Sequence, residues 1–372
     1  MAAIRPKEFL MIPGPTPVPD EILEIHGRQP LGHRSTEFSG QVELAVQGLK
    51  WLGETESDPL ILTASGTGAM DAAVANTINR GDRVLSLVCG VFGERFAKIA
   101  EAYGASVERL TVEAGQAIDI ESVKKALAAD TGKEIKAVTV THNETSTGVI
   151  NDLESIARVV KAHGALILVD AVTSLGAAHL PIDKWKLDVV IAGSQKALML
   201  PPGLAVIYFG KEAWKAYDQC NNGRFYLDLK RYKTSQDKNT TPFTPNVSLV
   251  MTLVKSLEMM KEEGREAIQK RHIEMRTMLR EALIEMGLKP VVEEGNASPT
   301  ITSVWPPEGV SVADIRARLK GDYAIIVADG QEDLKGKIFR IGHMGYVFPR
   351  DIGMTINALA TIFKSLKPVT RS

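Results

Sequence analysis

Residues 165–196 read ALILVDAVTSLGAAHLPIDKWKLDVVIAGSQK, and this stretch decides the fold class of the chain. It contains two uninterrupted apolar runs of strand length, Ala165–Val169 and Val189–Ala192. Strands that are apolar on both faces are typical of a parallel sheet covered by helices on both sides. Polar residues follow each run, with Asp170 after the first and Gly193-Ser194-Gln195-Lys196 after the second.

The same alternation extends outward in both directions along the chain. Further strands are expected at Leu60–Thr63, Arg83–Val88, Val107–Val112, Ala137–Thr141 and Ala205–Phe209. Helical patterns are expected between them, at residues 69–78, 94–103, 120–129 and 153–163. Strands that alternate with helices predict an α/β fold around a mostly parallel, seven-stranded sheet.

The alternation ends near Phe209, and residues 210–247 form a polar stretch. A long helical pattern then runs from Ser248 to Met286 with a break near Gly264, and shorter units close with a helix over Asp351–Leu366. We therefore expect an N-terminal segment (1–20), a large cofactor-binding α/β domain (21–249) and a smaller α+β C-terminal domain (250–372).

Composition narrows the class of protein. The 372 residues carry a net charge of -1 with scattered Lys and Arg, which argues against nucleic-acid binding. The two cysteines, Cys89 and Cys220, form no disulfide framework, and no apolar run could span a membrane. No secretory signal is visible in residues 1–11, and the seven histidines show no metal-ligand spacing. We expect a cytoplasmic protein without a metal.

In open α/β sheets, ligands bind beyond the carboxyl ends of the strands. After the run at Leu60–Thr63, Ser65-Gly66-Thr67-Gly68 opens a helix, where free N–H groups and hydroxyls suit a phosphate. The alternative is an ordinary glycine-rich turn with a Ser or Thr cap. The stretch lacks both the Walker A lysine and the third glycine of a dinucleotide site, so a nicotinamide dehydrogenase ranks low.

Lys196 and Asp170 become informative together. Alone, such a lysine is commonly a surface residue, and such an aspartate is commonly a helix cap. Desolvation after a buried strand would instead make the Lys196 amine a nucleophile toward a carbonyl. Pyridoxal phosphate needs a Schiff-base lysine and an acid that faces its pyridine nitrogen. The phosphate loop, Asp170 and Lys196 follow in that order, each at the end of a strand.

Two further residues fit this hypothesis. Phe92 lies between glycines after the run at Arg83–Val88, where it could stack on a flat ring or pack in the core. Arg340 interrupts the apolar run at Ile338–Gly342. A buried guanidinium needs a partner, which could be a protein acid or the carboxylate of a substrate.

The chain also resembles a known family. Gly193-Ser194-Gln195-Lys196-Ala197-Leu198, followed by Pro201-Pro202-Gly203, resembles the cofactor-lysine signature of class V aminotransferases, within the alanine–glyoxylate and serine–glyoxylate group. Further matches span almost the whole chain: Pro13-Gly14-Pro15, Gly32-His33-Arg34-Ser35, Ser65-Gly66-Thr67, residues 141–148, Val169–Val172 and Phe339–Gly342.

The resemblance implies a fold type I, pyridoxal-phosphate-dependent transferase that works as a homodimer. It assigns the phosphate to Ser65, Gly66, Thr67 and Gln195, with Thr241 or Thr244 reaching the neighbouring subunit's phosphate. The remaining cofactor roles fall to Val172 on one ring face, to Phe92 where relatives often have tryptophan, and to Thr145 near the ring hydroxyl or the substrate. Arg340 would bind the substrate carboxylate, with Gly14 also on the substrate side.

This resemblance predicts transfer of the amino group of alanine or serine to glyoxylate, by a ping-pong reaction through a Lys196 Schiff base. Arg34 is the one candidate for a second cation, and a preference for diacids would follow if it points into the site. The alternatives are another class V aminotransferase, acting on ureidoglycine and glyoxylate or on 2-oxoglutarate, and a non-catalytic subunit that retains the fold. A cysteine desulfurase is disfavoured because no cysteine follows Cys220.

Overall fold

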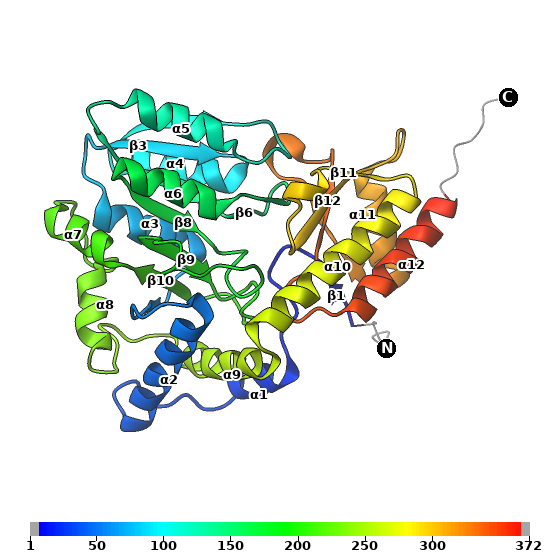
Figure 1. The fold of residues 1–372 in the computed structure, drawn as a ribbon. Helices are drawn as coiled ribbons and strands as arrows, with labels where there is room; N and C mark the ends of the chain where they lie inside the picture. The colour runs from blue at the N-terminus through cyan, green and yellow to red at the C-terminus, as the bar shows by residue number, and fades with distance from the viewer. Residues whose placement is uncertain (1–6, 366–372) are drawn as a thin grey trace.

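The computed structural model describes residues 7–365, which form a large and a small domain (Figure 1). The large domain is built on a seven-stranded sheet of order β2-β10-β9-β8-β5-β3-β4. Its strands are β2 (Leu60–Leu62), β3 (Arg83–Val88), β4 (Ser106–Thr111), β5 (Ile135–Thr141), β8 (Leu166–Asp170), β9 (Val189–Gly193) and β10 (Ala205–Phe209). Strand β10 runs antiparallel to both neighbours and the other pairs are parallel, which confirms the predicted mostly parallel sheet.

Helices cover both faces of this sheet (Figure 1). One face packs against α2 (Thr36–Gly53), α5 (Ile120–Ala129), α6 (Leu153–His163) and α9 (Val247–Glu263). The other packs against α3 (Gly66–Thr77), α4 (Val91–Ala102), α7 (Lys211–Gln219) and α8 (Leu229–Gln236). Within β9, Val190 and Ala192 join the first apolar cluster, whereas Val189 and Ile191 join the second. The uninterrupted apolar runs therefore reflect burial on both faces.

The polar stretch after Phe209 contains two helices, α7 and α8, that the sequence did not reveal. Helix α7 buries only Ala213, and α8 buries only Leu229 and Tyr232. Because helix prediction depends on a periodic apolar face, helices with so few buried residues leave a weak signal.

The small domain contains the antiparallel sheet β11-β12-β15-β14. Its strands are β11 (Lys289–Pro290), β12 (Ile301–Trp305), β14 (Ala328–Asp329) and β15 (Phe339–Gly342). Its helices are α10 (Arg265–Glu285), α11 (Val312–Tyr323) and α12 (Pro349–Ser365), and they share one apolar cluster with this sheet. The short strand β1 (Phe9–Leu10) pairs with β13 (Ile325–Ile326), and Met11 joins the same cluster. The N-terminal segment thus packs on the small domain.

The predicted domain boundary at residue 250 differs from the packing of α9. This helix packs against α2 and against α1 (Asp20–His26), and its Leu253 and Leu257 belong to the core of the large domain. Gly264, with a φ of 86°, separates α9 from α10, as the sequence predicted. We therefore propose that the boundary lies near Gly264.

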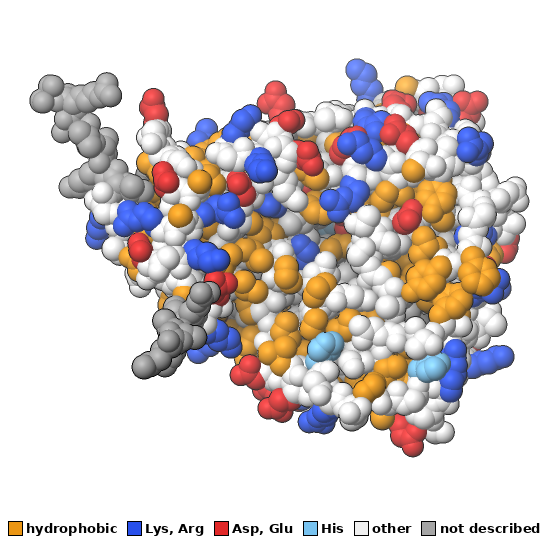
Figure 2. Space-filling model, turned by 180° about the vertical axis from the view of Figure 1, so that it is seen from behind, with side chains coloured by type: hydrophobic (Ala, Val, Ile, Leu, Met, Phe, Trp, Pro, Cys, Tyr) orange, Lys and Arg blue, Asp and Glu red, His pale blue; other side chains and the backbone are white. Residues whose placement is uncertain are grey.

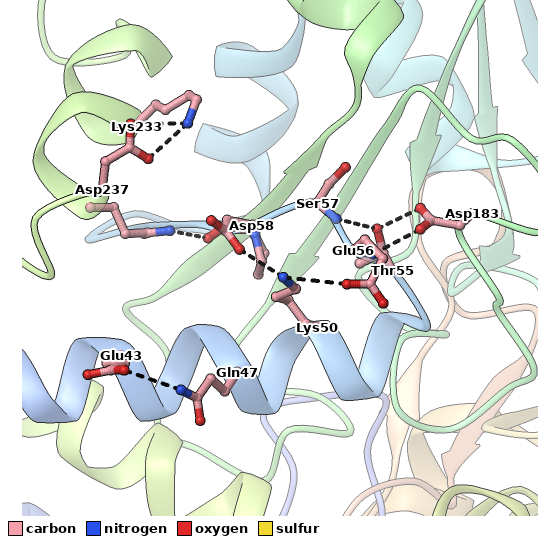
Figure 3. Close-up of polar contacts among 12 residues, drawn as sticks. Glu43, Gln47, Lys50, Thr55, Glu56, Ser57, Asp58, Asp183, Lys233 and Asp237 are labelled. Carbon is pink, nitrogen blue, oxygen red and sulfur yellow. Dashed lines mark hydrogen bonds and ion pairs between the residues drawn. The ribbon is translucent and has the colours of Figure 1, made fainter.

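The segment that leads into β2 is held in place by polar contacts (Figure 3). The Thr55 hydroxyl and the Glu56 backbone N–H donate to the Asp183 carboxylate, at 2.6 and 2.8 Å. Lys50 of α2 forms an ion pair with Asp58 at 3.2 Å. These contacts fix the start of β2, and the chain reaches the predicted phosphate loop directly after this strand.

Candidate active site

The carboxyl ends of β2, β5, β8 and β9 surround a cavity of about 260 Å³. The cavity is lined by Ser65, Gly66, Thr67, Met70, Phe92, Arg95, Thr145, Asp170, Val172, Thr173, Gln195, Lys196 and Gln331. Apart from Thr241 and Thr244, every residue that the sequence assigned to cofactor binding lies on its wall. Helices α3 and α4 begin three residues earlier than predicted, so both N-termini point to this site.

The N-terminus of α3 offers a cradle for an anion. Ser65 caps the helix, with its Oγ accepting from the Gly68 N–H at 3.1 Å. A Cβ atom on Gly66 would lie 2.8 Å from Val172 Cγ2, so only glycine permits this close approach. The hydroxyls of Ser65 and Thr67 and the free N–H groups of the first turn are the donors that a phosphate needs.

Asp170 and Lys196 are both buried on the cavity wall. Asp170 ends β8, and its Oδ1 accepts from the Val172 N–H at 2.9 Å. Burial raises the pKa of Asp170 to about 6, and burial lowers the pKa of Lys196 to about 8. The charge on Asp170 opposes the shift of Lys196 but does not cancel it. The site therefore holds a carboxylate and an amine that is partly neutral near physiological pH.

The N-terminal segment holds the Lys196 side chain in position. Its Nζ donates to the carbonyl of Pro13, and the Thr16 hydroxyl donates to the Lys196 carbonyl at 3.0 Å. Gly14 has a φ of 125°, and a Cβ atom there would lie 2.8 to 2.9 Å from three atoms of the Lys196 side chain. Gly14 therefore contacts the lysine, although it does not line the cavity.

Glu144 lies beside the site and has a positioning role that the sequence did not predict. Its side chain is fully buried, and Oε2 accepts from the backbone N–H groups of Phe92 and Gly93 at 3.1 and 3.2 Å. Its Oε1 accepts from the Ser146 N–H at 3.0 Å. A carboxylate at a helix N-terminus satisfies free N–H groups, so Glu144 fixes the start of α4 and with it the Phe92 ring.

Arg95 is a second residue that the sequence analysis missed. It follows Phe92 by three residues on α4 and so lies on the same helix face, which is the signal that could have revealed it. Its guanidinium lies 4.6 Å from the centroid of the Phe92 ring, and its Nη1 donates to Thr67 Oγ1 at 3.1 Å. The cavity therefore contains a cation beside the anion cradle.

Arg340 lies in β15, behind the cavity wall, and is 6% exposed. Its Nη1 donates to the Thr145 carbonyl and to Gln331 Oε1, both at 3.0 Å, and its Nε donates to the Asp329 carbonyl at 2.7 Å. Burial lowers its pKa to about 10. In the described part of the chain, no carboxylate lies within ion-pair distance of Arg340. Of the two partners that the sequence allowed, a protein acid is therefore not found among these residues, and a substrate carboxylate stays possible.

Thr241, Thr244 and Arg34 do not reach this cavity within one chain. Thr241 Oγ1 donates to the Phe243 carbonyl at 2.8 Å, and Thr244 is exposed. Arg34 donates to Thr240 Oγ1 at 2.7 Å and to the Thr241 carbonyl. Arg34 and Thr241 thus lie together, and the approach of the three residues to a neighbouring subunit stays a prediction.

Within residues 7–365, no group of three or more His, Cys, Asp or Glu side chains is placed to hold a metal ion. No helix of this part of the chain combines the length and the apolar character needed to cross a membrane.

Comparisons with known proteins agree with this geometry. The sequence matches the family described as Aminotransferase class-V over residues 24–340. It is 49% identical to the soluble hydrogenase small subunit of Synechococcus sp., covering 98% of this chain and 94% of that protein. It is 36% identical to serine–glyoxylate aminotransferase of Methylorubrum extorquens, covering 93% of this chain and 89% of that protein.

A solved structure, alanine–glyoxylate aminotransferase from Nostoc sp., superposes with a TM-score of 0.92 at 29% identity and covers 97% of both chains. The fold type predicted from the sequence is thereby confirmed. The family match, the relatives and the fold agree, and the chain belongs to the class-V aminotransferases, which depend on pyridoxal 5′-phosphate.

Proposed function

We propose that this transaminase moves the amino group of a small amino acid, alanine or serine, to glyoxylate. The products are glycine and either pyruvate or hydroxypyruvate. The observation that carries the proposal is the buried Arg340, whose planar guanidinium pairs with no acid among residues 7–365. An α-carboxylate is common to every amino acid and 2-oxo acid, and a guanidinium binds it through charge-assisted hydrogen bonds. Nε and Nη1 of Arg340 donate to protein oxygens, and Nη2 makes no hydrogen bond to residues 7–365, so Nη2 is the nitrogen available to a substrate. The names of the Methylorubrum and Nostoc relatives support glyoxylate as the acceptor.

The cavity wall fits pyridoxal phosphate. Ser65, Gly66, Thr67 and Gln195 are the candidates to hold the phosphate, and Asp170 to pair with the ring nitrogen. Val172 and Phe92 would pack on the two ring faces. Thr145 bonds Thr173 through their hydroxyls at 2.6 Å and would face the ring hydroxyl or the substrate. When bound, the cofactor accepts the electrons that remain after the substrate Cα loses its proton.

Lys196 and Arg340 are proposed to carry out the steps that the protein itself contributes. Lys196 would anchor the cofactor covalently, and after the amino donor has displaced it, the free Lys196 amine would take the proton from the substrate Cα. Arg340 holds the α-carboxylate of the donor and later that of glyoxylate. Because one clamp serves both substrates in turn, the reaction is ping-pong.

We infer that the active unit is a homodimer in which Thr241 or Thr244 reaches the neighbouring subunit's phosphate. An aromatic cluster of Phe225, Tyr226, Tyr232 and Phe243 supports this inference, because Phe225 is 65% exposed and Tyr226 is 43% exposed. Apolar side chains also spread widely over the face shown in Figure 2. Exposed apolar patches commonly mark protein interfaces. Light scattering on the purified protein measures the oligomeric state.

The alternative of a non-catalytic subunit is supported by two relatives that are named as soluble hydrogenase subunits. Against it stands the occurrence of Lys196, Asp170 and Arg340 together, since a protein that has no turnover does not need an amine, an acid and a carboxylate clamp at one site. A bleaching of the cofactor's colour by an amino donor separates turnover from cofactor binding alone.

The deciding experiment compares specificity constants for two acceptors, glyoxylate and 2-oxoglutarate, with alanine and then serine as the donor. We expect glyoxylate to be at least about tenfold better, because the extended acceptor must find room and a partner for its second carboxylate. A clear preference for 2-oxoglutarate would overturn the proposal and implicate Arg34 as a second carboxylate clamp.

The pKa of Lys196 leads to a pH prediction for the apoprotein. The neutral amine attacks a carbonyl, and its fraction rises with pH through the lowered pKa of about 8 instead of the ordinary 10.5. The rate of covalent attachment of pyridoxal phosphate should therefore rise with pH and level off above about 9. Stopped-flow absorbance measures this rate, and a continued rise beyond pH 10 would show that Lys196 is not desolvated.

A further inference from the structure

The guanidinium of Arg340 is only partly free to bind a carboxylate. Its Nε donates to the Asp329 carbonyl at 2.7 Å, and its Nη1 donates to two acceptors, the Thr145 carbonyl and Gln331 Oε1, both at 3.0 Å. A guanidinium holds a carboxylate with two parallel bonds through Nη2 together with either Nε or Nη1. Both of these nitrogens of Arg340 already serve the protein. The second oxygen of a bound carboxylate therefore needs a donor from another residue.

Gln331 carries such a donor. A guanidinium only donates hydrogen bonds, so the atom of Gln331 that faces Arg340 Nη1 must be the amide oxygen. The amide nitrogen, Nε2, makes no hydrogen bond to residues 7–365, and Gln331 lines the active-site cavity. Two N–H bonds are therefore available on the cavity wall, in a group that is bonded directly to the guanidinium.

The place of Gln331 distinguishes it from the nearby cation. A second cavity, of about 630 Å³, lies between α4, the ends of β3 and β4 and residues 331–334, and both Gln331 and Arg95 line the two cavities. The Arg95 guanidinium lies over the Phe92 ring and donates to Thr67 Oγ1, beside the anion cradle. Arg95 thus lies toward the phosphate end of the site, whereas Gln331 contacts the residue that is proposed to bind the substrate.

The loop that carries Gln331 is held in shape by its own contacts. Asp329 Oδ1 accepts from the backbone N–H groups of Gly330 and Gly336 at 2.7 and 2.8 Å. The Gln331 carbonyl accepts from the Leu334 N–H at 2.9 Å. A Cβ atom on Gly330 would clash with the Leu334 carbonyl oxygen, so the loop can close this tightly only with glycine there. A donor on a fixed loop loses little conformational entropy when it binds a ligand.

We propose that Gln331 is a substrate-binding residue that completes the carboxylate clamp. Arg340 Nη2 donates to one oxygen of the α-carboxylate, and Gln331 Nε2 donates to the other. This inference rests on the proposed function, because it concerns the carboxylate that Arg340 binds there. Since the amino donor and glyoxylate both carry this group, Gln331 acts in both half-reactions.

Gln331→Met removes the N–H donors and keeps the length of the side chain. We expect kcat/KM to fall about 10- to 100-fold for alanine, and equally within about threefold for glyoxylate, because a hydrogen bond to a charged group is lost. The carboxylate is held both before and during proton transfer, so most of the loss should appear in KM. Steady-state kinetics of the holoenzyme measure both constants. Glu332→Gln is the matched control: Glu332 is the next residue, is exposed and lines only the second cavity, so kcat/KM should change less than about twofold.

Gln331→Lys separates direct binding from an effect through Arg340. An ammonium group can donate to a carboxylate but cannot accept from Arg340 Nη1. If Gln331 binds the substrate, Gln331→Lys should recover kcat/KM to within about fivefold of the wild type. If Gln331 only orients Arg340, Gln331→Lys should lose as much as Gln331→Met. That second result, or a Gln331→Met enzyme within about twofold of the wild type, would overturn the inference.

Binding of propionate, which has a carboxylate but no amino group, gives a readout that does not depend on turnover. Titration of the holoenzyme with propionate is followed by the absorbance of the cofactor. The Kd should rise about tenfold or more in Gln331→Met and recover in Gln331→Lys, and an unchanged Kd in Gln331→Met would contradict the proposal. If neither alanine nor serine reacts with glyoxylate, the proposed function fails, and the propionate comparison still decides whether Gln331 binds a carboxylate.

Discussion

Replacement of Lys196 by alanine is expected to slow transamination by about 10²- to 10⁴-fold or more while the protein stays folded. A range of about 10²- to 10⁴-fold is the usual contribution of one positioned proton-transfer group, and loss of the covalent anchor slows the reaction further. The fold should survive because, within residues 7–365, the Lys196 side chain makes a single hydrogen bond, to the Pro13 carbonyl, and the nearby charge that its removal affects is Asp170. Asp170 can then take up a proton, since burial has already raised its pKa to about 6.

Two measurements check this prediction. Reduction of the wild-type holoenzyme with borohydride, followed by peptide mapping, should place the pyridoxyl label on Lys196, and the variant should carry none. Single-turnover kinetics with alanine should show the loss in the proton-transfer step. Lys215→Ala is the matched control, because Lys215 is exposed and, among the residues that the structure describes, its ion-pair partner is Glu212. A label on another lysine, or near wild-type turnover in Lys196→Ala, would refute the assignment.

The elements that position Lys196 and Asp170 could be read from the sequence because they are buried on both faces. Strands β8 and β9 have no polar residue before Asp170 and Gly193, so their ends were visible as the point where the apolar run stops. The same reasoning fails for α7 and α8, where burial of one or two residues leaves too little periodicity. In this chain, the elements that could be predicted from the sequence are those that bury much apolar surface.

The site residues that the sequence did not reveal act through contacts between distant segments. Glu144 binds N–H groups some fifty positions earlier in the chain, at Phe92 and Gly93. Gln331 meets the site because the small domain brings it beside Arg340 and Thr145. A pattern along one segment carries no information about such pairings. Arg95 differs, because it follows Phe92 by three residues on α4 and so lies on the same helix face, but the predicted helix began at Glu94 and left Phe92 outside it.

The first residues of α3 and α4 were predicted wrongly, and the reason is the capping of each helix. Helices α3 and α4 were expected to begin at Ala69 and Glu94, where the apolar periodicity begins. They begin at Gly66 and Val91, because Ser65 caps the first and Glu144 binds the N–H groups at the start of the second. Capping residues extend a helix beyond its apolar stripe, and in this fold that extension carries both N-termini to the cavity.

Replacement of Arg340 by glutamine is expected to cost about 2–5 kcal/mol in transition-state binding, which corresponds to a fall in kcat/KM of roughly 30- to 5,000-fold. The charge that binds the α-carboxylate disappears, and the carbonyls of Thr145 and Asp329 lose a donor inside the protein. Arg340→Lys should recover little, because an ammonium group cannot provide the planar pair of donors.

The loss in Arg340→Gln should be equal, within about threefold, for the half-reactions with alanine and with glyoxylate, because both substrates carry the group that Arg340 binds. Rapid-mixing absorbance on each half-reaction measures this loss, and thermal unfolding of the same samples shows whether the fold is retained.

Arg316→Gln is the matched control: Arg316 lies on α11, binds Asp329 at 3.4 Å and lines neither cavity. Because the Arg316–Asp329 ion pair is partly exposed, Arg316→Gln should change kcat/KM less than about fivefold. A loss confined to one half-reaction would show that Arg340 does not bind the carboxylate that the two substrates share, and a loss explained by unfolding would assign it a structural role.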